Sequence, residues 1–444
     1  MRARIWVAAL VGVVWLLPAV RAEEAVTLAE RFAVGDRHRV RIRVDLSGSM
    51  TAPAAKGKAA KKLEIEGASA LDYEEAVLAV DDGKVSKTVR SYEKLDFRRT
   101  LAGQAQQLAL RPGVRRLVIL RKGHTEVPFS PDGPLTWGEM DVVRTDVFVP
   151  GLGGLFPAKA VSVGDRWSAT ASAVQELTDL EKIEEGTLDC KLERIGMVGK
   201  RRMARVTFTG TVRGVGEDGP VRHRLQGNYH FDLVSNHLAD LTLIGTTTMA
   251  GPDGKEAGSI TGRFVMTREL GGSMPSISEA GLRGVKLDPD DDNTQMLYED
   301  AALGVRFLHS RRWRIAQVMG TQIALAATDG NGVLITIDPV DRVPTASAFM
   351  EESRAWLVKK DAKQVRTYNP RRLRDRPTLD AFALEASLGE QKMWMDYYVT
   401  AQPGGGATIA ARLVSADLPA VRRDVEKVAR SVTITKTIQA TKGK

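Results

Sequence analysis

Histidine and carboxylate side chains are the first candidates for chemistry in this sequence, because imidazole both ligates metals and acts as a base. His230 and Asp232 lie two residues apart in a segment of alternating polarity, which places them on one face of a predicted strand. Zinc needs three or four converging ligands, and His223 falls on the opposite phase. The pattern favours a solvated polar face, and we predict no metal site and no cofactor. A hydrolase site assembled from dispersed residues such as His230 and Asp232 remains an alternative.

Three further patterns resemble catalytic or ligand-binding motifs but are incomplete. Ser91-Tyr92-Glu93-Lys94 has the Ser-x-x-Lys spacing of some acyl-transfer enzymes but lacks their companion elements. The acidic run at 288–293 lacks calcium-loop spacing, and the glycines at 151–154 lack phosphate-loop spacing and predict a mobile apolar loop. Cys190 lies on the apolar face of its segment, which predicts a buried, unreactive thiol. No catalytic residue is predicted, and we expect a protein that is not an enzyme.

Two groups of arginines in the C-terminal part are the strongest candidates for binding, because guanidinium groups suit phosphates and carboxylates. The candidate anion-binding residues are Arg311, Arg312, Arg314, Arg371, Arg372, Arg374 and Arg376. The alternative is an arginine-rich surface that is merely solvated.

The start of the chain predicts export. Arg2 and Arg4 precede an uncharged apolar run over residues 5–20, and residues 20–22 suit cleavage after Ala22. The run is shorter than the ~20 residues that a spanning helix needs. We therefore expect a signal peptide over residues 1–22, a periplasmic or secreted location, and no transmembrane segment after cleavage.

The charge of the chain indicates which partners to expect. The 444 residues carry a formal charge of +9, and the basic excess is concentrated in the C-terminal part. Such basicity alone would favour nucleic acid, but an exported protein does not meet chromosomal DNA, so we expect no nucleic-acid partner. An anionic envelope lipid, a cell-wall polymer or another envelope protein fits better. The single cysteine excludes an intramolecular disulfide framework.

The elements that must position these residues are mainly strands in the first part of the chain. Residues 38–46 alternate strictly between apolar and charged, which is typical of a half-buried strand. Five longer extended segments follow, separated by turn residues, at 187–195, 202–213, 222–233, 237–249 and 259–269. They predict an antiparallel β-meander that forms a curled sheet or half-barrel.

The second part of the chain has a mixed pattern, so the fold class expected for the whole is α+β. Four short strands precede a helix that starts after Thr345, and further strands lead to a closing helix near Pro419. The predicted division is a signal peptide at 1–22, a β-rich domain at 23–270, an acidic, Gly-Pro-Ser-containing linker at 271–297, an α/β domain at 298–436 and a disordered tail at 437–444.

The pattern of residues 298–315, followed by this order of elements, resembles the PsbP-like family. Residues 309–313 stand where that family has a Pro-Gly-Trp-like turn, and here they read His-Ser-Arg-Arg-Trp. The resemblance implies a C-terminal α/β/α sandwich built on an antiparallel sheet. It also implies an exported or organelle-luminal accessory protein that binds partners, and it supplies no catalytic residue.

The first part of the chain resembles uncharacterised exported bacterial β-rich proteins through residues 155–167 and 227–232. Its meander is also similar in architecture to the half-barrels of lipoprotein carriers, whose concave face holds acyl chains. The sequence therefore predicts an exported, non-enzymatic binding or accessory protein of the cell envelope, with no ligand identified. A lipid or lipoprotein carrier that uses the concave face of the sheet is the main alternative.

Overall fold

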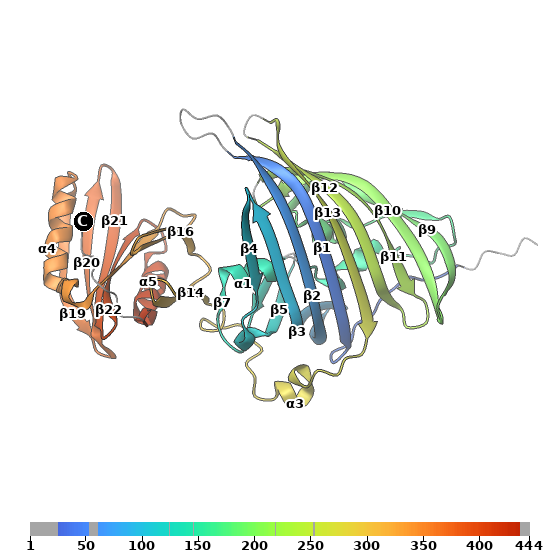
Figure 1. Cartoon of the computed structure of the whole chain (residues 1–444), viewed down its shortest axis with the longest axis horizontal. Helices are drawn as coiled ribbons and strands as arrows, with labels where there is room; N and C mark the ends of the chain where they lie inside the picture. The colour runs from blue at the N-terminus through green and yellow to red at the C-terminus, as the bar shows by residue number, and fades with distance from the viewer. Residues whose placement is uncertain are drawn as a thin grey trace, which may run out of the picture.

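The computed structural model describes residues 25–52, 61–123, 125–144, 146–217, 219–251 and 254–435. The predicted signal peptide and C-terminal tail lie outside these residues. The described chain is mostly β and forms one large antiparallel sheet and two smaller sheets (Figure 1).

The large sheet contains twelve strands and runs from β6 at one edge to β8 at the other, with β4 paired to β3 beside this path. Strands β9 to β13 pair in sequence, which confirms the predicted meander, and β1 lies between β13 and β2. Within the described residues the edge strands β6 and β8 do not pair, so the sheet is open, and the prediction that it curls into a half-barrel is not confirmed. The strands are β1 (Arg37–Ala52), β2 (Lys61–Asp81), β3 (Lys84–Leu101), β4 (Gln104–Ala109), β5 (Arg116–Lys122), β6 (Thr125–Phe129), β8 (Arg166–Ser168), β9 (Lys182–Val198), β10 (Arg201–Gly216), β11 (Gly219–Asp232), β12 (His237–Ala250) and β13 (Glu256–Leu270).

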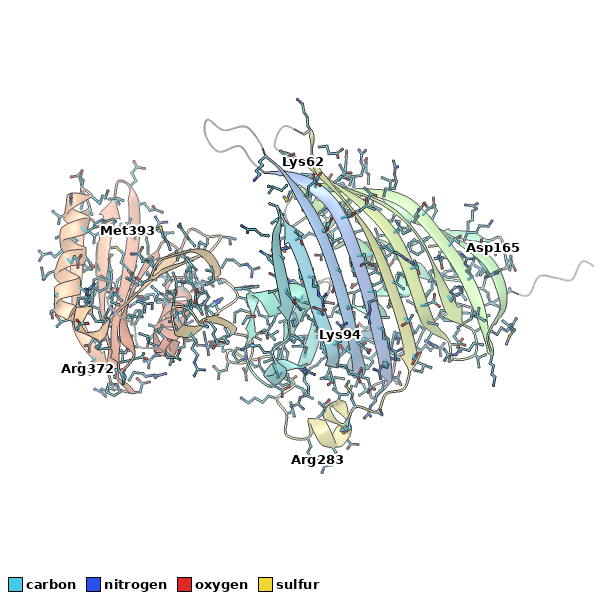
Figure 2. All side chains as sticks on the ribbon, viewed as in Figure 1. Lys62, Lys94, Asp165, Arg283, Arg372 and Met393 are labelled. Atoms are coloured by element: carbon cyan, nitrogen blue, oxygen red, sulfur yellow. The ribbon has the colours of Figure 1, made fainter. Side chains whose placement is uncertain are left out.

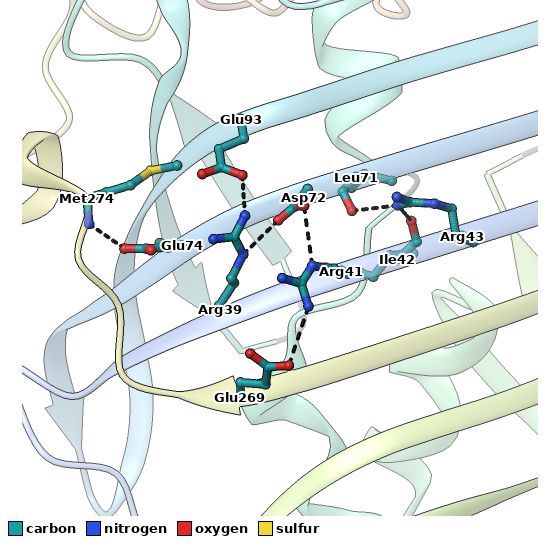
Figure 3. A network of polar contacts seen from close by, with 10 residues as sticks. All are labelled: Arg39, Arg41, Ile42, Arg43, Leu71, Asp72, Glu74, Glu93, Glu269 and Met274. Atoms are coloured by element: carbon teal, nitrogen blue, oxygen red, sulfur yellow. Dashed lines mark hydrogen bonds and ion pairs between the residues drawn. The ribbon is translucent and has the colours of Figure 1, made fainter.

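The outer face of the large sheet carries charged side chains that pair across neighbouring strands. Arg39 contacts Asp72 at 3.3 Å and also pairs with Glu93 (Figure 3). Arg41 lies 3.4 Å from both Asp72 and Glu269. Solvent-exposed pairs of this kind contribute only about 0–1 kcal/mol each. The alternation predicted for residues 38–46 is therefore confirmed, with the arginines of β1 on the solvated face.

The inner face of the large sheet is covered by a segment of short helices: α1 (Trp137–Val143), the 3-10 helix η2 (Val149–Leu155) and α2 (Ala171–Thr178). Leu152 and Leu155 have no exposed surface. The Leu155 carbonyl accepts hydrogen bonds from the Tyr229 hydroxyl at 3.0 Å and from the Trp167 indole at 2.8 Å. The expectation of a mobile apolar loop at 151–154 is wrong, because these leucines pack into the core of the sheet.

The C-terminal sheet has seven strands in the order β16-β17-β18-β22-β21-β20-β19. Leu379 and Ala381 of β20 join one core with helix α5, whereas Phe382 and Leu384 join another with helix α4. One helix therefore covers each face. The elements are β16 (Arg314–Met319), β17 (Gln322–Ala326), β18 (Gly332–Asp338), α4 (Ala346–Lys359), β19 (Lys363–Leu373), β20 (Arg376–Leu388), β21 (Gln391–Gln402), β22 (Gly405–Leu413) and α5 (Leu418–Ser431).

A small third sheet joins the two parts of the chain. Its order is β23-β15-β14-β7, and β7 pairs in parallel with β14 although the two lie far apart in sequence. The segment expected to be a linker also makes contacts, since Ile277 is 1% exposed and packs beside strands β3 and β5. The elements are β7 (Leu135–Thr136), α3 (Glu279–Leu282), β14 (Met296–Asp300), β15 (Val305–His309) and β23 (Thr433–Ile434).

Among the helices of the described residues, none combines the length and the apolar character needed to cross a membrane.

Candidate ligand-binding cavity

A cavity of about 530 Å³ lies between the inner face of the large sheet and the segment that covers it. Its floor comes from β1, β11, β12 and β13, whose apolar lining side chains include Leu46, Leu225 and Phe264. Gly245 and Gly262 pair with each other across β12 and β13 and also line the cavity. Because glycine brings no side chain to the floor, this part of the sheet stays hollow.

The wall of the cavity is charged and comes from three separate segments. Arg121 of β5 donates a hydrogen bond to Glu126 of β6 at 3.0 Å and pairs with Glu176 of α2 at 2.5 Å. Its guanidinium also lies 5.0 Å from the centre of the Phe148 ring. Glu176 in turn accepts a hydrogen bond from the Phe148 amide at 2.6 Å. These contacts hold the covering segment against the β5–β6 hairpin.

A buried ionic cluster centred on Arg90 supports this wall from behind. Arg90 donates to Glu75 at 2.8 Å and to Asp146 at 2.7 Å, and all three side chains are 1% exposed. The guanidinium lies 4.8 Å from the centre of the Tyr73 ring. A buried charge is tolerated only when it is paired, so Arg90 fixes Asp146 in the wall.

Carboxylates outnumber guanidinium groups around the cavity. Burial raises the pKa of Glu126 to about 7, against the effect of Arg90 and with a further contribution from the carboxylate of Glu176. Burial likewise raises the pKa of Asp146 to about 6. The acids that line the cavity are Glu126, Asp146, Glu176, Asp179, Glu181 and Glu217, and the basic residues are Arg121, Arg144, Arg263 and His223. A cation that entered the cavity would relieve this crowding.

The first group of predicted anion-binding arginines lies where the two parts of the chain meet. Arg311 donates a hydrogen bond to the Thr294 carbonyl at 3.0 Å and another to the Pro128 carbonyl. Burial lowers the pKa of Arg311 to about 10. The guanidinium of Arg314 lies 3.3 Å from the centre of the Trp137 ring. Arg312 faces Asp424 of α5 at 3.8 Å.

The second predicted group lies at the opposite edge of the seven-stranded sheet. Arg371, Arg374 and Arg376 are exposed, and no ion pair of the described residues involves them. Arg372 pairs with Asp380 at 3.0 Å and lies on the surface (Figure 2). Since Arg314 belongs to edge strand β16 and Arg371 to edge strand β19, the structure does not bring the two groups together.

The histidine and carboxylate candidates have separate partners. His230 is hydrogen-bonded through Nδ1 to Asp240 at 2.8 Å. Asp232 accepts hydrogen bonds from the backbone amides of Val234 and Ser235 and so stabilises the turn after β11. The described residues contain no group of three or more side chains able to hold a metal ion.

The structure also shows the surroundings of two other candidates from the sequence, Ser91 and Cys190. The Ser91 hydroxyl lies 2.8 Å from the Ser276 hydroxyl, a partner outside the Ser-x-x-Lys pattern. Cys190 is fully buried, as predicted, and burial raises the pKa of its thiol to about 12.

Sequence reasoning missed the cavity wall. Glu126, Asp146 and Glu176 come from three segments with no shared motif, and only tertiary packing joins them. The one usable local signal is the run of turn residues at 130–134, which is followed by a helical pattern at 135–143.

No protein-family model and no curated protein matches the sequence. Among solved structures, the Ran-binding protein Mog1p of Saccharomyces cerevisiae is 8% identical, with 32% of this chain and 96% of that chain covered, at a TM-score of 0.27. The PsbP protein of the cyanobacterium Synechocystis is 19% identical, with 32% and 92% covered, at a TM-score of 0.25. Lipovitellin is 9% identical, with 65% and 29% covered, at a TM-score of 0.32. These likenesses concern fold over part of the chain.

Proposed function

We propose that this protein is an exported, non-enzymatic binding protein of the cell envelope that holds an amphiphilic ligand, such as a lipid, under its large sheet. The observation that carries the proposal is the cavity of about 530 Å³ with an apolar floor and a charged wall. Its volume falls within the roughly 300–1,000 Å³ of small-molecule sites. In this proposal the open sheet and the segment that covers it hold the ligand in the way that the half-barrels of lipoprotein carriers do.

The two surfaces of the cavity suit the two ends of an amphiphile. Leu46, Leu225 and Phe264 can cover an apolar chain, and burial of that chain supplies most of the binding free energy. Glu126 and Glu176 face the other end, where their carboxylates favour a cationic or hydrogen-bond-donating head group. We therefore expect an alkylamine to bind better than the alkyl carboxylate of equal length.

Binding fits the cavity better than catalysis. The pKa of Glu126 would suit a general acid or base, but such a group needs a nucleophile or reacting partner beside it. The described lining contains no serine, cysteine or lysine. The lining does contain His223, which is hydrogen-bonded to Thr247 at 3.0 Å, and no ion pair of the described residues gives this histidine a carboxylate partner. His230, the residue named in the hydrolase alternative, is hydrogen-bonded to Asp240 and does not line the cavity.

The C-terminal part is proposed to be the partner-binding unit, in keeping with the PsbP-like sandwich expected from the sequence. Its exposed arginines, Arg371, Arg374 and Arg376, offer guanidinium groups that no described acid occupies. An anionic envelope lipid, a cell-wall polymer or another envelope protein with an acidic surface would suit them.

The test is binding of dodecylamine, dodecanol and dodecanoate, together with native mass spectrometry of protein purified from its own envelope. Gly262→Leu should place a side chain on the cavity floor and so lower dodecylamine affinity by at least about tenfold. The variant should fold, because a Cβ at position 262 meets its nearest neighbour at an ordinary 3.6 Å. Gly196→Leu is the matched control, since a Cβ there meets nothing within 4 Å. A protein that carries no ligand from the envelope and binds none of the three probes would refute the proposal.

A further inference from the structure

Exposed apolar side chains gather at one end of the strands of the large sheet, where turns connect neighbouring strands. We call this end the turn edge, as distinct from the edge strands β6 and β8. Within the described part of residues 25–270, six large apolar side chains are exposed, and five of them lie at this edge. Val34 is 66% exposed and Val234 is 75% exposed, and both lie in turns, where polar residues are usual. We call this set the turn-edge patch, and it comprises Val34, Met197, Val198, Val234 and Leu270.

The register of the strands shows that these five residues share one edge, which is the lower edge of the large sheet in Figure 1. His38 pairs with Leu270, so the turn before β1 adjoins the end of β13. Asp232 pairs with His237 and with Met203, so the β11–β12 turn adjoins the β9–β10 turn. The patch is therefore built from neighbouring turns.

The turn-edge patch is surrounded by basic side chains. Arg31 and Arg37 flank the Val34 turn, and Lys200 and Arg201 follow Met197 and Val198. Arg31, Lys200 and Arg201 are exposed, and the guanidinium of Arg201 also lies 4.0 Å from the Asp232 carboxylate. These four cations lie at the same edge as the apolar residues.

The nearby acids are mostly engaged within the protein. Asp36 accepts a hydrogen bond from the Ala33 amide at 2.7 Å, and Glu30 pairs with the buried Arg268. Asp232 is 3% exposed and bonds to its own turn. The β2–β3 turn, with Asp81 and Asp82, is acidic and marks the limit of the patch.

We propose that the turn-edge patch docks this protein on an anionic lipid bilayer. Apolar side chains on separate turns can enter the boundary between head groups and acyl chains, and Lys and Arg beside them attract anionic lipids. A bilayer surface adapts to separate protruding turns, whereas a rigid protein would need a matching hollow for each. The proposed ligand cavity extends toward the other ends of β11, β12 and β13, so the docking stands independently of it.

The experiment is co-sedimentation of the chain from Glu23 onward, which contains every described residue, with two kinds of vesicle. Vesicles of mixed phosphatidylcholine and phosphatidylglycerol should bind the protein, and vesicles of phosphatidylcholine alone should bind it much more weakly. Added salt should release the bound protein, because salt screens the attraction between surface charges.

Two variants test the two components of the patch. The double change Met197→Asp and Val234→Asp should lower binding to the mixed vesicles by at least about tenfold. The double change Lys200→Gln and Arg201→Gln should lower it about 25-fold, at about fivefold for each cation removed. Val358→Asp is the matched control, because Val358 is 60% exposed on α4 and lies outside the patch. That variant should bind as the wild type does.

Several results would overturn the proposal. Wild-type protein that stays in the supernatant with both vesicles would do so, as would patch variants that bind like the wild type. Capture of a protein partner that the patch variants lose, without vesicle binding by the wild type, would overturn it in favour of a protein surface. An unchanged thermal melting curve checks that each variant folds. If the aspartate variant does not fold, the glutamine variant decides.

Discussion

Arg90 is a buried cation on which two buried carboxylates of the large sheet depend. Its guanidinium lies between Glu75 and Asp146, and all three side chains are 1% exposed. Arg90→Met keeps an apolar chain of similar length but leaves two carboxylates buried without their cation. We expect the free energy of unfolding to fall by about 3–5 kcal/mol, measured by urea denaturation.

The control for this prediction is an arginine in an exposed pair. Arg98 is 68% exposed and lies 3.0 Å from Asp96. Arg98→Met should change the free energy of unfolding by no more than about 1 kcal/mol. If Arg90→Met had an equally small effect, the buried cluster would not have the role assigned to it.

Glu126 should give the protein a distinctive dependence of stability on pH. Its pKa is raised from 4.5 to about 7 in the folded protein, so the folded state holds its proton more tightly than the unfolded state. The unfolding free energy should therefore fall as the pH rises from about 4.5 to about 7. Asp146, with its pKa raised to about 6, should contribute a fall in the same direction.

The pH prediction is measured as a difference between two proteins, since many groups titrate in this range. Urea denaturation of wild type and Glu126→Gln should give curves that converge at low pH and separate as the pH rises, with the variant the more stable. Curves that stay parallel across the range would show that Glu126 keeps an ordinary pKa.

At the scale of elements, the covering segment over the inner face decides whether the sheet has a core. Leu152 of η2 has no exposed surface, so Leu152→Ala should cost about 2–5 kcal/mol of unfolding free energy. A mobile loop at this place would give almost no change. Val358→Ala, at a site that is 60% exposed, serves as control and should stay within about 0.5 kcal/mol.

Some elements could be predicted from the sequence because their signals are local. The turns and alternation between 187 and 269 predicted the meander strands β9 to β13, with ends that lie within five residues of the observed ones. The place of β1 could not be predicted. It pairs with β13, whose residues lie more than 200 positions away, and local periodicity holds no information on such pairing. The cavity is formed by strands brought together through such pairings, so it could not be predicted from the sequence either.

At the scale of the whole molecule, the two parts are joined by contacts that composition could not indicate. An acidic stretch with glycine and proline predicts a free linker at 271–297, yet Ile277 is buried beside β3 and β5. The parallel pairing of β7 with β14 ties residue Leu135 to Met296. Arg314 stacks over Trp137 at the same junction. The arginines that were expected to bind anions there are engaged by the protein itself.

This junction leads to a prediction that separates the two groups of arginines. Arg311 donates to the carbonyls of Pro128 and Thr294, so Arg311→Met leaves two oxygens without their charged donor. We expect a loss of about 1–3 kcal/mol in the free energy of unfolding, and calorimetry should show the two parts unfolding in separated transitions. Affinity for inorganic polyphosphate should not change.

The double change Arg371→Gln and Arg374→Gln should do the opposite, because both side chains are exposed and no described acid pairs with them. It should weaken polyphosphate binding and leave stability within about 0.5 kcal/mol. Arg311→Met that weakened polyphosphate binding without destabilising the protein would return Arg311 to the group of ligand-binding residues.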